Sequence, residues 1–122
     1  MRHGFSDMEW KQAIEQTTNI LMDVARNNPY PLISYSDLAE QITYIDLQPH
    51  DKRMGILLGE ISRTEHAEGR GMLSVLVVDK SGDLKPSKGF FELAKDLGED
   101  VSDEPAFWLS EWNKVQTYWA TE

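Results

Sequence analysis

The sequence predicts a small α+β domain in which helices at both ends pack on a small antiparallel sheet or hairpin formed by residues 72–86. Two observations predict this fold class. Apolar residues recur at helical spacing near both ends of the chain, and a run of apolar and β-branched residues lies between them. A chain of 122 residues with 40% hydrophobic and 27% charged residues is typical of one globular domain, spanning residues 1–122.

Three helices are expected in the N-terminal half of the chain. The first, roughly residues 7–26, begins at a capping box made by Ser6 and Glu9. A short second helix follows a similar capping signal at residues 34–37. The third runs from about residue 51 to residue 65, and its expected buried stripe consists of Met54, Leu57, Leu58 and Ile61.

The central segment carries the strand prediction. Residues 72–78 are rich in β-branched and apolar side chains, which favours a strand that is covered on both faces. Residues 79–83 have the composition of a turn, and residues 84–86 are expected to form a short return strand that ends at Pro86.

Two further helices are expected near the C-terminus. Residues 89–98 predict about two turns ending at Gly98, and Ser102 or Asp103 can cap a last helix with Pro105 in its first turn. An apolar stripe follows on that helix: Trp108, Trp112, Val115 and Trp119. Core packing is the commoner use of such a stripe, while an interaction face or a base-stacking platform is the alternative.

Charge is distributed unevenly along the chain. The formal net charge is −9, and residues 96–122 hold seven acidic residues against one basic residue. Nucleic acid and anionic membranes are disfavoured as partners because phosphate binding requires clustered lysine and arginine. The charge favours a basic partner through electrostatic steering, although it could also serve solubility alone.

The sequence contains no recognisable catalytic motif, so we expect a binding protein rather than an enzyme. It has no nucleophile elbow, Walker loop or dinucleotide fingerprint. His66 and Glu68 match half of a zinc-deaminase signature, but the cysteine pair of that signature is missing. We therefore expect no catalytic residues, no metal ligands and no cofactor, and an enzyme acting through His66 and Glu68 is the least favoured hypothesis.

Absence of cysteine fits a reducing compartment, which favours a cytoplasmic location. The N-terminal residues lack the apolar run of a signal peptide, and no stretch approaches the length of a membrane span. We expect no membrane association and no export by a classical signal.

Candidate partner-binding residues cluster in the acidic segment near the last helix. Its carboxylates exceed what helix capping requires, and an aromatic residue borders them. The candidates are Asp96, Glu99, Asp100, Asp103, Glu104 and Trp108. Arg70, framed by two glycines, is a further candidate because its guanidinium could bind a carboxylate or phosphate; it could also cap the preceding helix or pair locally.

Two family resemblances can be tied to residues. The stretch Ile33–Ala39, the sequence around Arg53 to Leu58, and the Val77–Val78 strand with its Gly82 turn look like the winged-helix domain of DNA alkyltransferases and alkyltransferase-like proteins. This resemblance covers about half of the chain, and the Pro-Cys-His-Arg type motif of that family is absent. It implies a winged-helix arrangement of helices.

The second resemblance is to small bacterial proteins, through residues 69–78 followed by residues 89–94. Their compact acidic form resembles the immunity proteins of contact-dependent growth inhibition and related toxin systems. The resemblance implies an immunity protein or antitoxin that binds and neutralises a toxin. Because the acidic segment suits the positively charged cleft of a nuclease or ribonuclease, we expect a toxin of that class, neutralised by occlusion of its active site. The alternative function is a winged-helix-like nucleic-acid-binding regulator that touches phosphates with Lys52, Arg53, Arg63 and Arg70.

Overall fold

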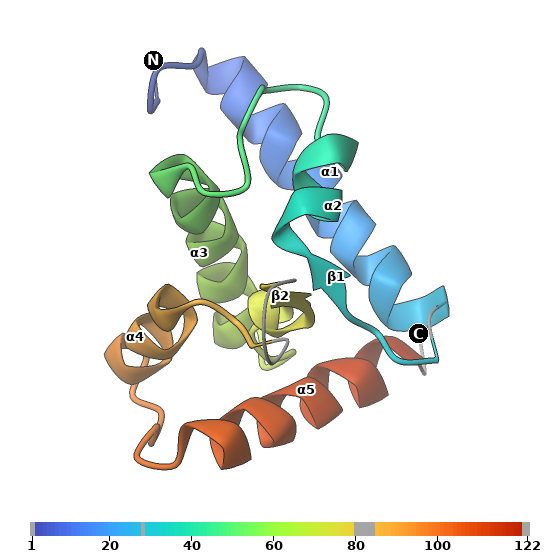
Figure 1. Cartoon of the computed structure of the whole chain (residues 1–122), viewed down its shortest axis with the longest axis vertical. Coiled ribbons are helices and arrows are strands. Elements are labelled where there is room, and N and C mark those ends of the chain that lie inside the picture. Colours follow the sequence, from blue (N-terminus) through green and yellow to red (C-terminus); the bar gives the residue numbers. More distant parts are fainter. Residues whose placement is uncertain (1, 28, 80–84, 121–122) are drawn as a thin grey trace.

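The structure, a computed structural model, describes residues 2–27, 29–79 and 85–120, and these residues are mostly helical. Figure 1 shows the helices arranged around a short central segment that contains β2. In chain order the elements are α1 (Asp7–Asn27), β1 (Ile33–Ser34), α2 (Tyr35–Gln41), α3 (Lys52–Ala67), the 3-10 helix η1 (Leu73–Leu76), β2 (Val77–Val78), α4 (Lys88–Asp96) and α5 (Glu104–Ala120).

The predicted starts of the first three helices are confirmed by their capping contacts. Ser6 and Glu9 exchange hydrogen bonds between side chain and backbone, with distances of 3.0 and 3.1 Å. The Ser34 hydroxyl accepts a bond from the Asp37 backbone N–H, and the Asp51 carboxylate accepts one from the Arg53 backbone N–H. These bonds satisfy backbone donors that the first turn of a helix leaves without partners.

The predicted antiparallel sheet or hairpin over residues 72–86 is wrong. Residues 73–76 form the 3-10 helix η1, and β2 pairs with β1 in parallel, with Ile33 opposite Val77 and Ser34 opposite Val78. Residues 80–84, which hold most of the predicted turn and the start of the return strand, lie outside the described residues. The Asp79 backbone N–H donates to the Lys85 carbonyl at 2.7 Å, so the two sides of this segment do meet.

Complete burial explains why the central apolar run misled the strand prediction. Residues 71–78 are all buried, as a strand covered on both faces would be. Their backbone groups, however, bond to side chains of the surrounding helices. The Met72 N–H donates to the Glu111 carboxylate of α5 at 2.7 Å, and the Ser74 N–H donates to the Ser62 hydroxyl of α3 at 3.0 Å. Such partners satisfy a buried backbone without a neighbouring strand.

The aromatic stripe of α5 packs mainly into the core, as its spacing predicts. Val115 and Trp119 are buried, and Trp108 and Trp112 are half-buried. The two half-buried indoles donate to main-chain carbonyls, Trp108 to Val75 at 3.1 Å and Trp112 to Pro31 at 3.0 Å. The stripe therefore holds α5 against the central segment and the chain that leads into β1.

Gly71 is a position at which we expect an added methyl group to cost stability. Gly69 and Gly71 both have positive φ, at +77° and +90°. A Cβ at Gly71 would lie 2.9 Å from Val115 Cγ2, whereas a Cβ at Gly69 would meet nothing within 4 Å. The left-handed backbone alone costs an alanine about 1–2 kcal/mol. Crowding adds about 1–3 kcal/mol. Gly71→Ala should therefore lower the free energy of urea unfolding more than the matched Gly69→Ala, and equal losses would contradict this packing.

Candidate functional site

The acidic candidates lie together at the junction of α4 and α5, which we call the acidic edge and define as Asp96, Glu99, Asp100, Asp103 and Glu104. Asp96 ends α4 and Glu104 begins α5, so two helix ends and their short connection hold all five carboxylates. Glu99 is half-buried and the other four are exposed. Figure 1 shows this connection at one corner of the molecule, below α4. The structure thus brings together residues that the sequence already placed in one run.

Two carboxylates of the acidic edge also organise the backbone. Asp100 accepts a bond from the Ser102 N–H at 3.0 Å, and the same contact lowers the pKa of the Asp100 carboxyl. Asp103 accepts a bond from the Ala106 N–H at 3.2 Å and so caps α5. Part of the local negative charge therefore serves helix capping, and the exposed oxygens still face solvent.

The other end of the acidic edge makes long contacts with α3. Asp96 lies 4.0 Å from the Arg63 guanidinium, and Glu99 lies 4.0 Å from the His66 imidazole. Arg63 and Asp96 are exposed, and an ion pair between exposed side chains at this separation contributes little stability. A partner could therefore replace Arg63 with its own cation at small cost.

An apolar pocket opens beside the acidic edge, and the sequence did not predict it. It has a volume of about 330 Å³ and lies between α4, α5 and residues 85–86. The lining residues are Lys85, Pro86, Phe91, Glu104, Pro105, Trp108 and Leu109. Trp108 was a candidate from the sequence, whereas Leu109 lies off the apolar stripe and is 52% exposed. The signal available in the sequence was an apolar residue, Leu109, that does not share the spacing of the stripe.

Arg70 is engaged locally and does not belong to the acidic edge. Its guanidinium forms a two-pronged contact with the Glu65 carboxylate, with Nε 3.0 Å from Oε1 and Nη2 2.5 Å from Oε2. These bonds raise the pKa of Arg70, and Glu65 is only 5% exposed. The structure supports local pairing over presentation of this arginine to a ligand.

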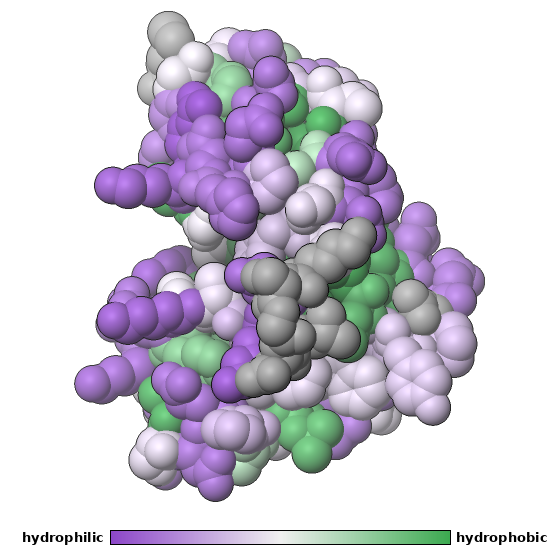
Figure 2. All heavy atoms as spheres, in the orientation of Figure 1, coloured by the Kyte–Doolittle hydropathy of each residue, from purple (hydrophilic) through white to green (hydrophobic). Residues whose placement is uncertain are grey.

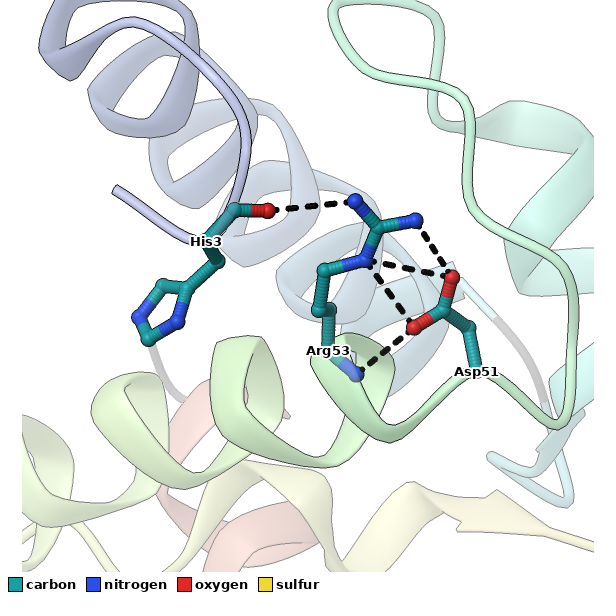
Figure 3. A network of polar contacts seen from close by, with 3 residues as sticks. All are labelled: His3, Asp51 and Arg53. Carbon is teal, nitrogen blue, oxygen red and sulfur yellow. Dashed lines mark hydrogen bonds and ion pairs between the residues drawn. The ribbon is translucent and has the colours of Figure 1, made fainter. Parts of the chain in front are cut away.

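Arg53 is also engaged, so two of the four cations proposed to touch phosphate in the alternative function are held in close pairs. Figure 3 shows Arg53 clamped between the Asp51 carboxylate and the His3 carbonyl oxygen, with Nη2 2.7 Å from Asp51 Oδ2 and Nη1 3.1 Å from the His3 oxygen. Arg63 faces Asp96 as described above. Lys52 alone of the four is not recorded in a salt bridge among the described residues.

The described residues contain no group of three or more histidine, cysteine or acidic residues arranged to hold a metal ion. Within the same residues, no helix combines the length and apolar character needed to cross a bilayer.

Comparison of the chain with family models, curated proteins and solved structures found no match. The charges and contacts of the described residues are therefore the basis of the functional proposal.

Removal of the Arg70 guanidinium should destabilise the fold. Arg70→Ala would leave the Glu65 carboxylate buried without its cation, and breaking a buried pair costs about 3–5 kcal/mol. The Arg70 side chain is 27% exposed, so in the variant water can reach the Glu65 carboxylate and partly solvate it. We therefore expect the free energy of unfolding to fall by about 2–3 kcal/mol. The Glu65→Gln, Arg70→Ala double variant should recover part of that loss. A change below about 0.5 kcal/mol for Arg70→Ala, typical of a surface site, would refute this role.

Asp51 should make stability depend on acid pH. Hydrogen bonds from the Arg53 side chain lower the pKa of Asp51 from 3.8 to about 2. Because the pKa is lower in the folded state, the carboxylate stabilises the fold above pH 3.8 and this contribution disappears as the pH falls through about 2. Asp51→Asn keeps a capping oxygen but cannot titrate. The stability difference between the two proteins, measured by urea unfolding, should shrink over that interval; a difference independent of pH would contradict the pairing.

Proposed function

We propose that this chain is an acidic inhibitor of the immunity or antitoxin type, which binds a basic protein partner and covers its active site. A nuclease or ribonuclease toxin domain is the leading class of partner. The observation that carries the proposal is the exposed acidic edge at the α4–α5 junction, in a chain with a net charge of −9.

Nuclease clefts carry lysine and arginine because they bind phosphate groups. A surface of clustered carboxylates is complementary to such a cleft, and complementary charge accelerates association and suppresses unsuitable partners. The acidic edge holds Asp96 and Glu104 on two helix ends and its other three carboxylates on the connection between them. In this proposal Asp96, Glu99 and Glu104 meet the cations of the partner, while Asp100 and Asp103 contribute charge and hold the backbone.

The nucleic-acid-binding alternative receives less support. Arg53 and Arg70, two of the four cations that would touch phosphate, are held by Asp51 and Glu65. Binding to DNA depends on cations that are available to release counterions from phosphate. No other feature of the described residues favours this function over protein binding.

The test is a set of three substitutions that remove negative charge from the acidic edge and keep the hydrogen bonds to the backbone. Asp100→Asn and Asp103→Asn retain an oxygen that accepts the backbone bonds, and Glu104→Lys reverses an exposed charge. The triple variant and the parent protein, both tagged, would be used to capture partners from the native host at a series of salt concentrations. We expect the parent to retain a basic protein in stoichiometric amount, and the triple variant to lose it at a lower salt concentration.

A matched control carries the same change of net charge elsewhere. Asp23→Asn, Asp46→Asn and Glu15→Lys alter exposed residues of α1 and of the segment between α2 and α3. This control should retain the partner as the parent does. Equal loss of the partner in both triple variants, or none in either, would refute the acidic edge as the binding surface. Co-eluting nucleic acid with a steep salt dependence would instead favour the regulator.

A further inference from the structure

We infer that the apolar pocket beside the acidic edge is an anchor site for one large apolar side chain of the partner, carried on a segment rich in lysine or arginine. This inference rests on the proposed function and specifies the chemistry of the partner. Interfaces draw most of their affinity from a few anchors in well-packed pockets, and flanking charges add specificity.

Five of the seven lining residues are apolar, and contacts within the protein hold two of their rings in place. Pro86 and Pro105 have no backbone N–H to donate. The Trp108 ring is held by its bond to the Val75 carbonyl, 3.1 Å away. Phe91 packs edge-on against the buried Phe90, with ring centroids 5.2 Å apart and planes at 81°. Binding of a ligand would therefore lose little conformational entropy in the side chains of the pocket.

The size of the pocket selects the kind of occupant. Sites for whole small molecules occupy about 300–1,000 Å³. At about 330 Å³ the pocket is at the low end of that range, which suits one phenylalanine or leucine side chain better than a cofactor.

Leu109 exposes apolar surface at the pocket, and a partner that covered this surface would gain binding free energy. It is 52% exposed although its neighbour Trp108 is half-buried. Figure 2 shows hydrophobic surface between hydrophilic side chains over the lower part of the molecule, where α4 and α5 lie. Covering apolar surface of this kind contributes about 25 cal/mol for each Å² removed from water.

Charge determines the surroundings of the anchor. Glu104 lines the pocket and belongs to the acidic edge, with the exposed Asp103 directly before it. Lys85 also lines the pocket, so the basic neighbours of the anchor should lie on the Glu104 side. A segment with an aromatic or aliphatic residue between cations fits this arrangement, and one with acidic neighbours does not.

The test uses short peptides and the full chain. Acetyl-Lys-Arg-Phe-Arg-Lys-amide would be titrated into the ¹⁵N-labelled protein, with the Trp108 indole N–H and the Leu109 amide as reporters. We expect saturable shifts at both positions. The peptide with alanine in place of phenylalanine should bind at least about tenfold more weakly, and acetyl-Glu-Glu-Phe-Glu-Glu-amide should leave both signals unchanged. Equal binding of the alanine peptide, or shifts confined to other residues, would overturn the inference.

A pair of variants locates the site. Leu109→Gln removes the apolar rim without a change of charge, and Ile56→Gln is its control because Ile56 is 40% exposed on α3 and does not line this pocket. Leu109→Gln should abolish the shift of the Trp108 indole N–H while Ile56→Gln retains it; the opposite pattern, or no effect of either, would refute the pocket.

The two proposals can fail separately. Peptide binding that depends on Leu109, together with capture of the native partner that ignores the acidic-edge substitutions, would keep the anchor site and remove the inhibitor mechanism. Capture that depends on the acidic edge but not on Leu109, with no phenylalanine-dependent peptide binding, would do the reverse.

Discussion

Burial of residues 71–78 governs how the surrounding helices are arranged. These eight residues lie inside the molecule, where a backbone N–H or carbonyl without a partner is costly. Only Val77 and Val78 pair with another strand, so the remaining groups rely on η1 and on side chains from the helices around them. Ser62 of α3, together with Glu111 and Trp108 of α5, supplies those partners. The surrounding helices therefore cover this segment and also supply hydrogen-bond partners for its backbone groups.

The same contacts determine where the candidate site lies. α5 is tied to the centre by Glu111 and Trp108, and Trp112 ties it to the carbonyl of Pro31 just before β1. With that face turned inward, the first two turns of α5 place Glu104 and Leu109 at the pocket, beside Phe91 of α4. The apolar pocket and the acidic edge thus share one helix start, which places a charge contact and an anchor on one surface.

Helices were the part of the fold that could be predicted from sequence, because their signals are local. Ser6, Ser34 and Asp51 cap the helices that follow them, and the buried stripe of α3 matches its spacing. For the run Met72–Val78, the prediction of burial is confirmed, and the prediction of a strand in an antiparallel hairpin is wrong. Apolar composition reports burial, while the choice between a strand and a 3-10 helix depended on Glu111 and Ser62, which are 39 and 12 residues away from their partners.

Local patterns in the chain specify the helices, several of their caps, the apolar stripe of α5 and the concentration of negative charge around residues 96–104. Each of these depends on residues within a few positions of one another. Only the folded structure shows that β1 is the parallel partner of β2 and that Glu65, rather than a ligand, pairs with Arg70. It also shows that Pro86, Phe91 and Leu109 line one pocket. The physical reason is that strand partners and pocket walls form only after the chain has folded, and pattern in a single sequence does not record which distant or competing groups will meet.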